Sequence, residues 1–217
     1  MQLPDSYRAA SEDRAEILML PENVVLTIIA DGVGGRPNGG NAAARAVKLV
    51  TATVQAAPLG RLTAPRFWER TLQAVDVTLA DDDQCGETTL VAVCVTPTRI
   101  TGASVGDLEA WWVDDSATAF ELTEGAIRKP YLGYGAARPT AFSFAMPRTG
   151  TLLVASDGLF KYADPRAIAS IMSRGSRITE SVSALRDAVR GSSGVLHDDF
   201  AVVLLRARAS PVQNNVS

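Results

Sequence analysis

The stretch that decides the fold is "VVLTIIADGVGGRPNGGNAAARAV", which runs from Val24 to Val47. It begins as an apolar run rich in β-branched residues, which predicts a buried strand. The run ends at Asp31 and passes into a glycine-rich turn, after which a segment of small residues is typical of a helix. The carboxylate at the end of this buried strand lies beside glycines that allow close approach, and whether it belongs to a binding site depends on the ends of the other strands.

The composition of the whole chain is that of a globular protein. Its 217 residues are 47% hydrophobic and 21% charged, so a sizeable core can form. The net charge of -3 and the lack of a basic run argue against a nucleic-acid partner. The polar, acidic N-terminal stretch is unlike a signal peptide, and no apolar run reaches the about 18 residues of a membrane span. We therefore expect a cytoplasmic protein that does not bind membranes.

Cys85 and Cys94 match no disulfide or zinc pattern, and Cys94 is expected to be buried.

The remaining segments predict an α+β fold. Short segments with β-branched and aromatic residues predict strands at 15–20, 23–30, 88–96, 99–105, 109–113, 140–146, 151–156 and 200–207. Helices are expected at 40–55, 64–80, 165–173 and 179–189, the third of them capped by Asp164 before Pro165. Because the strands cluster instead of alternating with helices, we expect antiparallel sheets covered by helices. A single domain is expected over 1–209, with a polar tail at 210–217 and a long surface loop, or flap, at 121–139.

Acidic residues lie at the ends of several predicted strands. They are Asp31, Asp107, Asp157 and the pair Asp198 and Asp199, while Glu12 and Asp13 precede the first predicted strand. If the last strand runs antiparallel to the others, these acids meet at one rim. Gathered carboxylates raise one another's pKa values, so such a cluster requires positive charge. Mg²⁺ or Mn²⁺ suits a set of oxygen ligands without histidine or thiolate. Two such ions about 3.5–4 Å apart are a common arrangement for phosphoester hydrolysis.

Taken singly, each acid has a simpler interpretation as a turn residue or a helix N-cap. The repeated position of Asp31, Asp157 and Asp198 at strand ends is what favours a metal site. Other sites are excluded by their motifs. Pro37 stands where a dinucleotide-binding loop requires a small residue, no lysine follows the glycines as in a Walker loop, and no serine lies in a G-x-S-x-G elbow. The single histidine, His197, is expected to be a turn residue or a neighbour of ligands, not a general base.

Six segments follow one another in an order that resembles a known family. They are "RAASED" (8–13), "ADGVGG" (30–35), "GETTLVAV" (86–93), "ASVGDLEAWWV" (103–113), "LLVASDGLFKY" (152–162) and "HDDFAVVLL" (197–205). Together they resemble the compact bacterial form of the PP2C family, the metal-dependent Ser/Thr protein phosphatases. The resemblance implies a four-layer α-β-β-α sandwich with two central antiparallel sheets. It also implies hydrolysis of phosphoserine or phosphothreonine by a metal-bridged hydroxide, without a phosphoenzyme.

The resemblance further implies which residues hold metal. Asp31 would bridge two ions, and the carbonyl group of Gly32 would contribute to one of them. Asp157 and Asp198 would complete the coordination of the second ion, and Asp107 would help to hold a third, weaker ion. The expected cofactors are therefore two Mn²⁺ or Mg²⁺ ions, with a further one bound less tightly.

Three more roles follow from the resemblance. Glu12 and Asp13 would act largely through metal-bound waters. Arg8 would bind the substrate phosphate, because the guanidinium group offers a fork of donors to a tetrahedral anion. Val33 stands where many relatives carry a histidine that is proposed to protonate the leaving group. The proton must therefore come from water or from another residue.

The sequence thus predicts a monomeric, Mn²⁺- or Mg²⁺-dependent phosphatase that acts on a phosphorylated protein and opposes a Ser/Thr kinase. The partner would be that kinase or one of its targets. Two alternatives stay open: a pseudophosphatase that keeps the fold as a binding module, and a hydrolase of small phosphoesters. The intact acids argue against the first, because an inactive site would have little use for a costly cluster of carboxylates.

Overall fold

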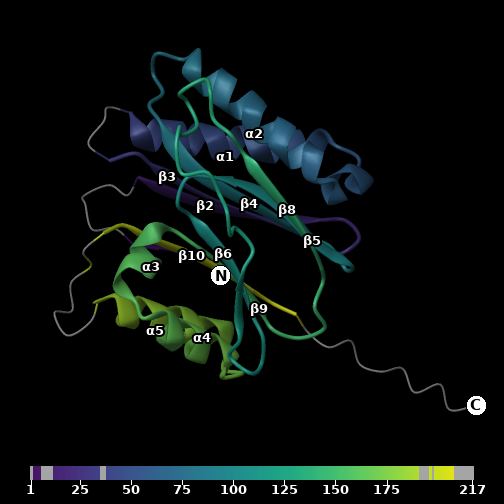
Figure 1. Cartoon of the computed structure of the whole chain (residues 1–217), viewed down its shortest axis with the longest axis vertical. Coiled ribbons are helices and arrows are strands. Elements are labelled where there is room, and N and C mark those ends of the chain that lie inside the picture. Colours follow the sequence, from purple (N-terminus) through teal and green to yellow (C-terminus); the bar gives the residue numbers. More distant parts are fainter. Residues whose placement is uncertain (1, 6–11, 35–37, 191–195, 197, 208–217) are drawn as a thin grey trace, which may run out of the picture.

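The computed structural model describes residues 2–5, 12–34, 38–190, 196 and 198–207. Its strands form two five-stranded sheets in which every pairing is antiparallel (Figure 1). In spatial order the first sheet contains β1 (Gln2–Asp5), β10 (Phe200–Arg206), β9 (Thr151–Ala155), β6 (Glu109–Val113) and β7 (Ala119–Glu121). The second contains β2 (Asp13–Leu20), β3 (Val24–Gly32), β4 (Thr88–Val95), β5 (Arg99–Val105) and β8 (Thr140–Ala145).

Helices cover the outer face of each sheet, as Figure 1 shows. The second sheet is covered by α1 (Gly39–Ala56) and α2 (Pro65–Ala80), which the short 3-10 helix η1 (Leu59–Thr63) connects. The first sheet is covered by α3 (Asp157–Tyr162), α4 (Pro165–Ser173) and α5 (Ile178–Arg190). This is the expected four-layer α-β-β-α sandwich. None of the described helices is both long enough and apolar enough to cross a membrane.

Three apolar layers stabilise the sandwich. One lies between the two sheets, one between the second sheet and the helices α1 and α2, and one between the first sheet and the helices α3, α4 and α5. Strand β3 contributes to two of them. Leu26 and Ile28 pack towards α1 and α2, whereas Ile29 packs between the sheets. Because both faces of β3 are covered, its sequence is a continuous apolar run and does not alternate with polar residues.

The predicted strands and helices are confirmed, with ends that differ by no more than two residues. The prediction for the start of α4 is also confirmed. The Asp164 carboxylate accepts the N–H of Arg166 at 3.2 Å, and Pro165 takes the first helical position. The sequence analysis missed β1, β7, η1 and α3, each of which has six residues or fewer. Segments this short give little periodic signal.

The segment 121–139 has the character of the predicted surface loop, or flap, because after Glu121 it contains no long helix or strand. However, Leu122 and Leu132 are 5% and 0% exposed, so the segment also packs inward. Leu132 pairs with Thr88 through two backbone hydrogen bonds of 2.9 and 3.0 Å, which joins the flap to the start of β4. Leu122 and Leu132 of the flap are therefore part of the core, whereas Ile127 and Tyr134 are exposed.

Candidate metal centre

The antiparallel pairings bring the acidic ends of four strands to one edge of the sandwich. In the second sheet, β3 and β5 both end at this edge, on either side of the start of β4. In the first sheet, β9 ends here and β10 begins here, because these two strands run antiparallel. A cavity of about 370 Å³ lies at this edge. It is lined by Glu12, Asp31, Gly32, Val33, Gly34, Thr89, Asp107, Tyr131, Asp157, Lys161, Asp198 and Asp199.

The structure therefore brings together all the residues predicted to hold metal. Asp31, Gly32, Asp157, Asp198, Asp107 and Glu12 line the one cavity. Asp13 lies beside Asp31, its partner in the register of β2 and β3. Arg8 and His197 lie outside the described residues. The roles of all these residues stay predictions.

Asp31 and Asp13 form the buried part of the site. Burial, together with the neighbouring Asp13 carboxyl group, raises the pKa of Asp31 to about 9. Burial also raises the pKa of Asp13 to about 6, although its hydrogen bonds to Asp31 and Ser156 oppose this. The pKa values of both carboxyl groups are raised, so the pair resists full ionisation when no cation is bound. The Thr88 hydroxyl donates to the Asp31 carbonyl at 2.7 Å and fixes the backbone there.

Two glycines permit the close packing around these acids. A Cβ atom on Gly32 would lie 2.4 Å from the carbonyl carbon of Gly39, at the start of α1. A Cβ atom on Gly158, the second residue of α3, would lie 2.2 Å from the carbonyl oxygen of Asp199. Both contacts are with backbone, which cannot move aside easily. Any larger residue after Asp31 or Asp157 would therefore clash with backbone, so the glycine of each D-G pair is required by close packing as well as by any need for ligand access.

The other acids lie on the side of the first sheet. Asp157 begins α3, and burial raises its pKa even though the ion pair with Lys161 opposes this. The Lys161 ammonium group also lies 3.4 Å from the Asp198 carboxylate. Asp199 is 8% exposed and accepts the backbone N–H of Glu12 at 2.9 Å. This bond joins the segment before β2 to the segment before β10, so the two sheets meet at the rim of the cavity.

The donor set suits a hard divalent cation. Six acidic residues and Gly32 line a cavity of about 370 Å³, which has room for hydrated ions. Burial, and after it the neighbouring carboxylates, raises the pKa values of Asp31 and Asp157, and a bound cation would offset both effects. In the described part of the chain, no three Asp, Glu, His or Cys side chains are already arranged to hold one ion. Instead Asp31 is paired with Asp13, and Asp157 and Asp198 are paired with Lys161.

The sequence assigned no role in the site to four residues that line the cavity, Asp199, Thr89, Tyr131 and Lys161, although Asp199 was among the acids expected at this rim. Only two of them carried a usable signal. Asp199 adjoins Asp198, and Lys161 follows Asp157 by four residues, which is the spacing of an ion pair on a helix. Tyr131 lies in the flap, whose sequence has no period from which an inward side chain could be inferred.

The Asp31→Asn variant is expected to be more stable than the wild type when no metal is present. The pKa of Asp31 is about 9 in the folded protein against 3.8 for an unperturbed group, so the folded state binds more protons between these pH values. The free energy of unfolding should therefore fall as pH rises from about 4 to about 9. Asparagine removes the ionisation but keeps a donor for Asp13. One pKa unit is worth about 1.4 kcal/mol, so we expect a gain of at least about 2–4 °C in Tm at pH 8.

Calorimetry in EDTA between pH 5 and 9 checks this, with the exposed Asp115→Asn as the matched control. The wild type and the control should both lose stability as the pH rises, and Asp31→Asn should lose less. An Asp31→Asn protein that is less stable than wild type at pH 8 would show that this carboxyl group is not held protonated by its surroundings.

Comparisons with known proteins agree with this fold. The profile of the family described as Stage II sporulation protein E (SpoIIE) matches residues 21–208. No curated protein matches the sequence significantly. Among solved structures, a point variant of a bacterial serine phosphatase has a TM-score of 0.86 at 18% identity, with 98% of each chain covered. The phosphatase Stp1 from Staphylococcus aureus has a TM-score of 0.83 at 19% identity, covering 97% of this chain and 94% of that one. The catalytic domain of PstP, a serine threonine protein phosphatase solved with two manganese ions, has a TM-score of 0.77 at 20% identity, covering 94% and 95%.

Proposed function

This chain belongs to the SpoIIE family of PP2C-type phosphatases, and we propose that it is an active, metal-dependent protein serine/threonine phosphatase. The observation that carries the proposal is the convergence of Asp31, Asp157 and Asp198 on one cavity, from strands of two different sheets. A binding module would gain nothing from keeping carboxyl groups whose burial raises their pKa values. We therefore prefer an active enzyme to a pseudophosphatase.

The proposed cofactors are two Mn²⁺ or Mg²⁺ ions, with a third bound less tightly. The two manganese ions of PstP support this proposal. Asp31 and the Gly32 carbonyl group would hold the first ion, and Asp31, Asp157 and Asp198 would hold the second. Asp107 would contribute to the third. When bound, such ions polarise a phosphate group and lower the pKa of an attacking water.

The chain's own residues prepare the cavity for this chemistry. Thr88 fixes the backbone of Asp31 by its 2.7 Å hydrogen bond, and Asp13 lies opposite Asp31 in the register of β2 and β3. The bond from the Glu12 N–H to Asp199 closes the rim. Because substrate positioning and charge stabilisation account for most of the rate in phosphoryl transfer, this fixed arrangement matters more than any single acid or base.

Leaving-group protonation is proposed to depend on solvent. Val33 lines the cavity at the position where many relatives carry histidine, and its side chain cannot donate a proton. The alkoxide of the released serine or threonine would then take its proton from water that reaches the cavity. Substrate phosphate binding by Arg8 remains part of the proposal. The proposed substrate is a phosphorylated protein, either a Ser/Thr kinase or a target of one.

An assay on a phosphothreonine peptide tests the proposal. Phosphate release should require added Mn²⁺, stop with EDTA, and return when Mn²⁺ is supplied in excess. Turnover of nucleotides and sugar phosphates, measured as kcat/KM, should be lower than turnover of the peptide. No release at saturating Mn²⁺ would favour a pseudophosphatase, and faster turnover of the small phosphoesters would favour a hydrolase of that class.

A further inference from the structure

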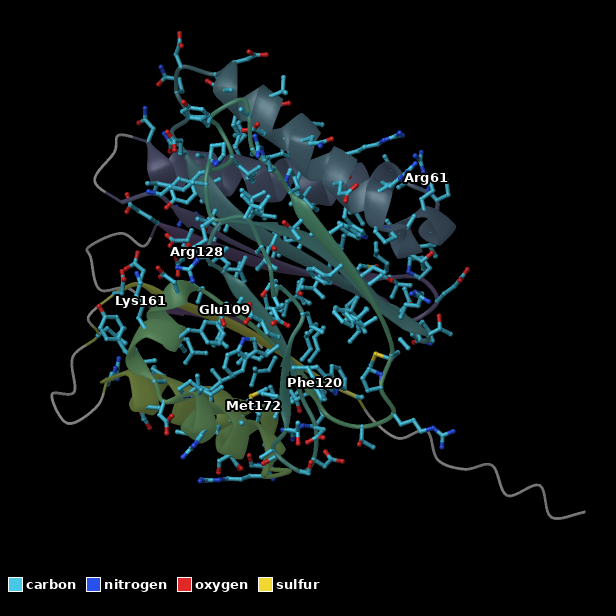
Figure 2. The ribbon with its side chains drawn as sticks, in the orientation of Figure 1. Arg61, Glu109, Phe120, Arg128, Lys161 and Met172 are labelled. Carbon is cyan, nitrogen blue, oxygen red and sulfur yellow. The ribbon has the colours of Figure 1, made fainter. Side chains whose placement is uncertain are left out.

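The ammonium group of Lys161 lies between two acids that the proposed function assigns to one metal ion. Lys161 is on α3, one turn after Asp157, and it pairs with the carboxylates of both Asp157 and Asp198. Its side chain lines the same cavity as the acids. Figure 2 shows Lys161 at the end of the sandwich where α3 lies. The cation is therefore part of the candidate metal centre, not of a separate surface patch.

A metal ion and this ammonium group cannot occupy the site together. A small divalent cation lies about 2.0–2.2 Å from its carboxylate ligands, which is closer than a hydrogen-bonded nitrogen. An ion held by Asp157 and Asp198 would thus take the space that the ammonium group now fills. Two cations in contact would also repel each other strongly in a partly buried site.

We propose that Lys161 is an internal counter-ion that holds the place of the second metal ion and leaves when that ion binds. This inference rests on the proposed function, because it takes Asp157 and Asp198 as ligands. Lys161 would set the metal affinity of the second position, since the incoming ion must break two ion pairs. The side chain of Lys161 is 52% exposed, so it can turn towards solvent without disturbing the core.

The two proposed metal positions differ in whether a cationic side chain is paired with their ligands. Asp31, assigned to both ions, is paired with the Asp13 carboxyl group and with no cation in the described structure. Among the described residues that line the cavity, Lys161 is the only cation. The first ion therefore meets no positively charged competitor among these residues, whereas the second does. We expect two Mn²⁺ ions to bind with unequal affinity, and the weaker step to be the one that Lys161 controls.

Isothermal titration calorimetry with Mn²⁺ on the metal-free protein tests this inference. Lys161→Met removes the charge and keeps a good helix former of similar length. It should lower the dissociation constant of the weaker site on the order of tenfold and leave the tighter site within about twofold. Lys48→Met, at an exposed position of α1, removes the same charge elsewhere and should change neither constant. Lys161→Arg keeps the charge and should bind Mn²⁺ like the wild type.

Thermal stability gives a second measurement that does not depend on activity. In EDTA, Lys161→Met should melt at a lower temperature than Lys48→Met, because Asp157 and Asp198 lose their counter-ion. At saturating Mn²⁺ this difference should disappear. Two Mn²⁺ ions bound with the same constants in the wild type and in Lys161→Met would overturn the inference alone. No Mn²⁺ binding by either protein would overturn the proposed function and the inference with it.

Discussion

The Asp157→Asn variant is expected to lose at least about 100-fold in kcat on a phosphothreonine peptide at saturating Mn²⁺. Asp157 is the first residue of α3 and lines the cavity with the other acids. Asparagine preserves the shape of the side chain but removes a negative charge and one ligand oxygen. A site that works by placing charge around a phosphate should be sensitive to that loss. Initial rates over a range of Mn²⁺ concentrations separate slower chemistry from weaker metal binding.

Asp187→Asn is the matched control for this variant. Asp187 lies exposed on α5, in the same helical layer, and the same substitution there should leave kcat unchanged. Circular dichroism should show that both variants keep the fold. Near-normal turnover of Asp157→Asn at every Mn²⁺ concentration would mean that this residue is not a ligand, and the site would have to be reassigned.

The sequence allowed the fold and the acid cluster to be predicted for related reasons. Strand β3 is recognisable because both of its faces are buried, and that burial makes the run before Asp31 continuously apolar. The convergence of Asp31 and Asp107 then follows from topology, because β3 and β5 lie on either side of β4 and end at the same edge of one sheet. Asp157 follows β9 of the other sheet, so its approach to Asp31 depends on how the two sheets pack together.

The sequence predicts both Asp198 and Asp199 at the rim of the site, and the family resemblance assigns a metal to Asp198 only. Both line the cavity, because the chain bends just before β10 begins and both side chains reach the same side. Their surroundings differ: Asp199 is buried and accepts the N–H of Glu12, whereas Asp198 pairs with Lys161. Glu12 lies 187 positions from Asp199 in the sequence, so the local sequence pattern could not predict this hydrogen bond. The predicted metal ligand is Asp198 alone, and the structure adds Asp199 as the residue that joins the two sheets.

Sequence analysis gave no indication of how the flap is held in place. Asp76 on α2 is 3% exposed, and its carboxylate accepts three backbone N–H groups of the flap. One oxygen accepts from Gly133 at 2.8 Å and from Gly135 at 3.0 Å, and the other accepts from Ala137 at 2.8 Å. Tyr131, in the same segment, lines the metal cavity. Asp76 on α2 thus holds in place the flap segment that contributes Tyr131 to the lining of the cavity.

The Asp76→Ala variant is therefore expected to lose about 3–5 kcal/mol in the free energy of unfolding, because three N–H groups lose a charged acceptor in a partly buried place. Asp76→Asn should lose less. Its amide oxygen can still accept from Gly133 and Gly135, while its amide nitrogen must face the N–H of Ala137. Urea unfolding measures both values, and Asp83→Ala, at an exposed position after α2, controls for loss of a negative charge. If Asp76→Ala falls within about 1 kcal/mol of wild type, the range of ordinary surface changes, water must replace the carboxylate, and Asp76 does not anchor the flap.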